Sequence, residues 1–171
     1  MHFQSLTVLS LAAFALALPT ALEVRQAGVL KATTFNDISI AGGVAGNAEE
    51  EAAAAFSALN LNDLASVSKA DLDFLNEVNQ VANDAEKEAF NPAVEGATGE
   101  AADAAQRGKI KNKVLKLMAT VIKLEAQQAQ GQDVADKLAE ETKKLDNNIA
   151  TDKKDAGKAS TAVPFDAAIQ S

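Results

Sequence analysis

One segment of this chain must be covered by neighbours on more than one side if it folds as a helix. Residues 107–124 read RGKIKNKVLKLMATVIKL. On a helical wheel at about 100° per residue, one apolar stripe forms and flanking side chains widen it to about half of the circumference. The stripe consists of Ile110, Val114, Leu117, Val121 and Leu124, and the flanking residues are Leu115, Met118 and Ile122. A helix with so wide an apolar arc is typical of the centre of a bundle.

The same segment is strongly basic, which offers a second interpretation. Its positive residues are Arg107, Lys109, Lys111, Lys113, Lys116 and Lys123, with no acid among them. A basic amphipathic helix could lie on an anionic membrane. We favour the bundle helix, because the other predicted helices carry narrower apolar stripes, and each of these stripes must pack against another helix. The wheel puts Lys113, Lys116 and Lys123 opposite the apolar stripe, together with Asn112 and Thr120, and Lys111 near its edge. These three lysines are the candidate contact for a partner or a surface.

Period and capping signals predict the other helices. Asn47 with Glu50 forms a capping-box pattern before an alanine-rich helix that ends at residues 60–63. Ser68 with Asp71 forms a similar cap before a helix with apolar side chains at three- and four-residue spacing. We expect that helix to stop at Asn91-Pro92, where Asn91 could cap the next one.

The second half of the chain continues the same pattern. Residues 93–108 carry three glycines and form the weakest helix signal, and residues 109–130 form the apolar helix, ended by Gly131. Asp133 can cap a last helix that continues to about Ala159. Residues 37–40, DISI, give the one strand signal. The sequence therefore predicts an all-α fold, an antiparallel bundle of four to five helices.

The N-terminus predicts export. Residues 1–17 combine a short polar start, an apolar run and an Ala-Leu-Ala cleavage pattern, which is typical of a signal peptide. We expect an N-terminal arm over 18–46, with an open question of processing after Arg25, a helical bundle domain over 47–160 and a flexible tail over 161–171. The run at 1–17 is too short for a membrane anchor, and no other segment is apolar enough to span a bilayer. The expected product is secreted and extracellular.

The amino-acid composition excludes several kinds of catalytic and metal-binding site. The chain has no Cys, Trp or Tyr, and its one His, His2, lies in the predicted signal peptide. Ser-His-Asp and Cys-His catalysis and the usual His/Cys zinc sites are therefore excluded after cleavage. We expect no catalytic, cofactor-binding or metal-binding residues. Hydrolysis by a pair of carboxylates in a cleft stays open, since acids are abundant.

Charge is divided between the two halves of the chain. Residues 26–106 hold fourteen acids and three bases, a net charge of −11, while residues 107–171 hold twelve bases and nine acids, a net charge of +3. Packing the halves together would pair these charges, although each exposed pair contributes only a fraction of a kcal/mol. A net charge of −8 for the whole chain argues against nucleic-acid binding.

Several segments resemble one group of proteins. The leader LSLAAFALALPTALEVRQ and the cysteine-free segments ATTFNDISIAGGVAGNAEEEA, DLDFLNEVNQVANDAEKEAFNPA and KIKNKVLKLMATVIKL are similar to small secreted proteins of filamentous fungi. Proteins of that group are commonly regarded as effector candidates or cell-surface proteins, so the resemblance implies a role in interaction and carries no catalytic motif.

Two functions follow as hypotheses. The first is a non-catalytic secreted helical protein that binds a host or environmental protein, for example as a virulence effector. The alternative is a hydrophobic-surface-binding or cell-wall-associated protein whose helices open and lay their apolar faces on the surface, since a thin, disulfide-free core opens at low free-energy cost.

Overall fold

The computed structural model describes residues 27–170, so the predicted signal peptide and the processing site after Arg25 lie outside the described residues. Six α-helices, a 3-10 turn, a π-helical turn and two short strands make up this part of the chain. In order they are β1 Thr33–Thr34, α1 Phe35–Ile38, α2 Ala48–Ala55, the 3-10 turn Leu64–Ser66, α3 Lys69–Ala85, the π turn Glu86–Phe90, α4 Asn91–Gly96, α5 Gly99–Ala129, α6 Ala135–Lys154 and β2 Ala168–Ile169.

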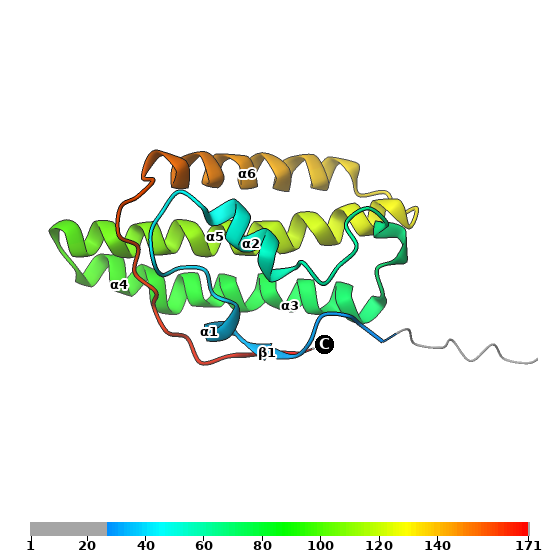
Figure 1. Ribbon diagram of the computed structural model, residues 1–171, viewed down its shortest axis with the longest axis horizontal. Coiled ribbons are helices and arrows are strands. Elements are labelled where there is room, and N and C mark those ends of the chain that lie inside the picture. The colour runs from blue at the N-terminus through cyan, green and yellow to red at the C-terminus, as the bar shows by residue number, and fades with distance from the viewer. Residues whose placement is uncertain (1–26, 171) are drawn as a thin grey trace, which may run out of the picture.

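Helix α5 is the centre of the fold. It runs antiparallel to α3 on one side and to α6 on the other, and α2 crosses it (Figure 1). The all-α antiparallel bundle is therefore confirmed, and so is the central place of the apolar helix. Helix α5 begins ten residues before the predicted start at 109. Among the residues described, no helix is both long and apolar enough to cross a bilayer.

The core forms where these helices meet. Val114, Leu115 and Ala119 of α5 are fully buried. Four phenyl rings from other elements complete the core: Phe35, Phe56, Phe74 and Phe90. Burying one such ring contributes roughly 2–3 kcal/mol, so these rings carry a large part of the stability of a core that is otherwise rich in alanine.

The helix ends bear out some of the capping signals. Ser68 accepts a hydrogen bond from the Asp71 amide at the start of α3, as predicted. At the end of α5, Gly131 adopts a φ of 85°. Its amide and that of Gln132 return to carbonyls of the last turn, a Schellman motif. The last helix, in contrast, has Val134 rather than Asp133 as its N-cap and ends at Lys154.

The Asn47 capping box is wrong. Asn47 precedes α2 but makes no side-chain cap. Asp152 of α6 takes its place: its Oδ2 accepts the amides of Gly46 and Ala48, each at 2.9 Å. A carboxylate at a helix N-terminus is favourable for both hydrogen bonding and the helix dipole, and here it also fixes α2 to α6.

The predicted stop at Asn91-Pro92 is also wrong. The helix continues from α3 through the π turn into α4, with Pro92 in the first turn of α4. Proline removes a backbone donor and crowds the preceding turn. A π turn widens the helix just before this point, so the chain passes the proline without a break.

The two terminal segments pack on the bundle as a pair of straps, residues 27–46 and 155–170. They lie side by side (Figure 1), joined by β1 with β2, by a bridge between Val44 and Ala159, and by the edge-to-face rings of Phe35 and Phe165, 5.9 Å apart. Ile169 is fully buried. The tail expected to be loose is thus held over its described part, and Phe35–Ile38 is a helical turn where DISI indicated a strand.

Gly108 allows the straps to cross α5. A Cβ at this position would stand 2.0 Å from the Thr161 carbonyl oxygen and 3.3 Å from that of Ala41. Both are backbone atoms, so neither can move aside without shifting a strap.

We predict that Gly108→Ala lowers the free energy of unfolding by about 2–3 kcal/mol, in spite of the better helix propensity of alanine. Gly96→Ala, at the end of α4 with no atom within 4 Å of the added carbon, should leave it unchanged or raise it by up to about 1 kcal/mol. Urea denaturation followed by circular dichroism measures both. Equal midpoints would contradict the proposed crossing.

Candidate binding face and pocket

The three lysines singled out in the sequence lie on one face, where α3 and α5 meet in a polar ladder. Lys123 donates to Asn76 at 2.8 Å, Asn79 donates to Thr120 at 2.8 Å, and Lys116 donates to Asn83 at 3.3 Å and to Glu86 at 2.6 Å. Lys113 lies 3.8 Å from Glu86 and completes the row. We call this row the α3–α5 ladder.

Register explains why these residues meet. In an antiparallel helix pair, residues three and four apart on one helix face residues with the same spacing on the other. Asn76, Asn79 and Asn83 have that spacing on α3, at the edge of its apolar face. The sequence analysis missed these asparagines, although their period of three and four was a usable signal.

Glu86 ends the ladder in the π turn. Burial raises the pKa of its carboxyl, but the hydrogen bond from Lys116 and the charges of Lys116, Lys113 and Lys109 outweigh that effect, and the pKa lies below its usual value. Lys123, at the other end, shows the opposite balance, because burial lowers the pKa of its ammonium group. The ladder thus keeps Glu86 ionised and partly disfavours the charge of Lys123.

Two hollows border the ladder. One, of about 280 Å³, lies between α3, α5 and α6 and contains Asn79, Asn83, Lys113, Lys116, Leu117, Glu141, Lys144 and Asn148. The other, of about 420 Å³, lies at the Lys123 end and contains Lys69, Leu72, Asp73, Asn76, Lys123, Gln127, Gln130 and Gln132. Amide groups and lysines dominate both linings, so this face can offer hydrogen bonds and positive charge.

Three polar residues of the basic segment, Arg107, Lys111 and Asn112, are buried instead of facing outward. Lys111 is fully buried and donates to the carbonyls of Gly42 and Val44 at 2.8 and 3.0 Å, with Glu51 at 2.7 Å. Asn112 is fully buried and donates to the Ala82 carbonyl at 2.9 Å. The helical wheel placed Asn112 on the polar side, and that placement is wrong because α3 covers it.

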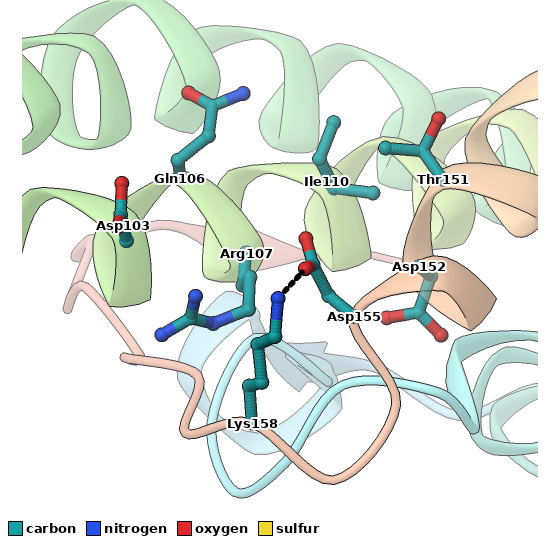
Figure 2. Close-up of a pocket in the computed structure, with 8 residues that line it drawn as sticks. All are labelled: Asp103, Gln106, Arg107, Ile110, Thr151, Asp152, Asp155 and Lys158. Carbon is teal, nitrogen blue, oxygen red and sulfur yellow. Dashed lines mark hydrogen bonds and ion pairs between the residues drawn. The ribbon is translucent and has the colours of Figure 1, made fainter. Parts of the chain in front are cut away.

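A separate pocket lies between α5 and the end of α6 (Figure 2), with a volume of about 240 Å³. It is lined by Asp103, Gln106, Arg107, Ile110, Thr151, Asp152, Asp155 and Lys158. Arg107 is buried and binds the Ala159 carbonyl and Glu100. Lys158 lies 2.6 Å from Asp155.

Two of the three carboxylates in this pocket, Asp152 and Asp155, already have partners within the protein. A general acid needs a raised pKa. The hydrogen bond from Lys158, which outweighs desolvation, lowers the pKa of Asp155 instead, and the charges of Lys158 and Arg107 act in the same direction. One oxygen of Asp152 is occupied by two backbone amides.

Comparison with known proteins places the chain in one family. Residues 30–164 match the family described as Domain of unknown function (DUF8454), and the chain belongs to that family. The match spans the whole bundle and most of the N-terminal strap, and it ends at residue 164, before β2. No curated protein and no solved structure matches the chain.

The pKa of Glu86 predicts how the ladder depends on pH. Because the folded-state pKa is lowered, the ionised carboxylate stabilises the fold above the unfolded-state value of about 4.3, and that contribution disappears as pH falls through the lower folded-state value. Glu86→Gln should therefore lower the free energy of unfolding by about 1 kcal/mol at pH 7 and have a smaller effect at pH 3.

Glu88→Gln is the matched control, since Glu88 is exposed on the same turn. Its effect should stay within about 0.5 kcal/mol at either pH. Chemical denaturation at pH 3, 5 and 7 provides the measurement. A Glu86→Gln effect that is the same at pH 3 and pH 7 would show that the ion pair does not cause it.

Proposed function

We propose that this protein is a non-catalytic, exported helical protein that acts by binding a partner protein through the α3–α5 ladder and its two hollows. The observation that carries the proposal is the gathering of half-buried lysines and amide side chains on one face of a protein whose net charge is −8. The partner surface that fits is acidic and rich in hydrogen-bond acceptors.

Export and a role in interaction with a host are part of the same proposal. The leader at 1–17 and the resemblance to small secreted fungal proteins support them, while the lack of histidine, cysteine and tyrosine after residue 17 supports the non-catalytic part of the proposal. In a producing fungus, deletion of the gene should weaken colonisation of the host and leave growth in culture unchanged.

The binding arm of the test compares two double variants of equal net charge. Lys113→Gln with Lys123→Gln removes two ladder charges, and Lys31→Gln with Lys154→Gln removes two exposed charges elsewhere. Each protein, immobilised after secretion from cells that express the full chain, is offered host extract and conditioned medium. The ladder variant should bind the captured partner about tenfold more weakly, and the control should bind as the parent does.

Three results would contradict the proposal. Retention of the full chain inside the cells would remove the export. Equal binding by both double variants would show that the ladder is not the contact face, and the absence of any saturable partner in either mixture would remove the binding function itself.

Binding to a hydrophobic surface is the second candidate, and helix α6 favours it. This helix packs mainly on α5 and buries four residues, Glu141, Leu145, Ile149 and Asp152. Gly131 and Gly157, both with positive φ, flank it. Opening of α6 as a unit would uncover the apolar side of α5 and would break the contact of Asp152 with the start of α2.

Depletion from solution tests this second function. Ile149→Ala should lower the free energy needed to open α6 by about 2–5 kcal/mol and increase the loss of protein onto hydrophobic beads. Anionic liposomes at low and physiological salt report the charge contribution in parallel. If neither the parent nor the variant is depleted, surface binding is excluded.

A further inference from the structure

The pocket between α5 and α6 holds a carboxylate oxygen that lacks a hydrogen-bond donor. Asp152 is 3% exposed, and its Oδ1 is buried with no partner among the described residues. Its other oxygen, Oδ2, already accepts two amides from the start of α2. A buried acceptor without a hydrogen-bond partner is destabilising, and more so when it is charged, so a ligand that donates a hydrogen bond to Oδ1 would be stabilised in this pocket.

The positive groups of the pocket are already in use. The guanidinium of Arg107 is held by Glu100 and the Ala159 carbonyl, and Lys158 pairs with Asp155 at 2.6 Å. Figure 2 shows Arg107, Asp155 and Lys158 in the middle of the pocket, with Asp103 on one side and Asp152 on the other. Neither of these outer carboxylates forms an ion pair within the described part of the chain.

This charge balance selects the class of ligand. With Arg107 matched by Glu100 and Lys158 by Asp155, the charges of Asp103 and Asp152 remain, which favours a cation over an anion. Among the described residues, no cluster of three or more metal-ligating side chains is present. An ammonium group also satisfies Oδ1 directly, since it carries up to three N–H donors.

The size and walls of the pocket narrow the ligand further. Its volume of about 240 Å³ lies below the roughly 300–1,000 Å³ of sites for drug-sized molecules. Ile110 supplies an apolar wall for a short alkyl chain, and Gln106 and Thr151 supply further hydrogen-bonding groups. Two unmatched carboxylates suit a ligand with an amine at each end.

We infer that this pocket binds a small organic ammonium ion, with one N–H donated to Asp152 Oδ1 and a second positive charge attracted by Asp103. The site lies between α5 and α6, apart from the α3–α5 ladder, and does not depend on the proposed protein partner.

Titration calorimetry of the purified full chain with 1,4-diaminobutane tests the inference. We expect saturable binding of one diamine per chain, with 1,4-butanediol, the neutral molecule of nearly the same shape, giving no heat. Asp152→Asn keeps an oxygen for the α2 amides but turns an N–H₂ donor toward the ligand, so the affinity should fall at least tenfold. Asp103→Asn should weaken it about threefold.

Asp136→Asn, an exposed change at the opposite end of α6, is the charge-matched control and should bind as the parent does.

Nα-acetyl-lysine amide separates the two sources of an ammonium group. Binding as tight as that of the diamine indicates a lysine of a peptide, and weaker binding indicates a free amine. Equal affinity of all three variants, or no saturable binding by the parent, would overturn the inference, since the acidic protein would then attract cations only nonspecifically. Asp103→Asn keeps the test valid if Asp152→Asn fails to fold.

Discussion

The rest of the structure depends on the crossing of both terminal straps over α5 near Gly108, in the N-terminal third of the helix. Gly108 lets the backbones approach, and one helical turn further on Lys111 donates to the carbonyls of Gly42 and Val44. A buried lysine is costly unless its donors are satisfied, and here strap carbonyls and Glu51 satisfy it. The straps therefore cover α5 and also provide hydrogen-bond acceptors for the buried ammonium group of Lys111. Loss of this crossing would leave α5 with a charged residue facing its apolar neighbours.

Local signals in the sequence predicted most of the helices. The spacing of apolar residues found α3, the wide arc identified α5 as the central helix, and Ser68 and Gly131 marked true ends, because each of these features acts within one or two turns. The failures involve partners far along the chain. Asn47 lost its expected role to Asp152, 104 residues away from the Ala48 amide that it caps. The helix continues past Pro92 because a π turn precedes it, and no short stretch of sequence predicts a π turn.

The candidate sites show the same difference between local features, which the sequence predicts, and contacts between distant segments, which it does not. The helical wheel grouped Lys113, Lys116 and Lys123 on one side, and the structure brings them together on the ladder. The helical wheel could not predict that asparagines of α3 would contact this row, because the register between two helices is set by packing. The pocket between α5 and α6 was missed altogether. Its residues come from positions around 103–110 and 151–158, which become neighbours only when α5 and α6 fold back on each other.

The pairing of β1 with β2 has a consequence for the order in which the chain folds. Thr33 pairs with Ile169 and Thr34 with Ala168, so this contact closes nearly the whole described chain into one loop. The entropy of closing such a loop must be overcome before the pairing contributes anything, whereas α5 and α6 are joined by a turn of a few residues. We expect the helical hairpins to assemble first and the straps to close over them last. Pairing of the straps is then the last step of folding, and in a protein without disulfides it holds the two ends of the described chain together.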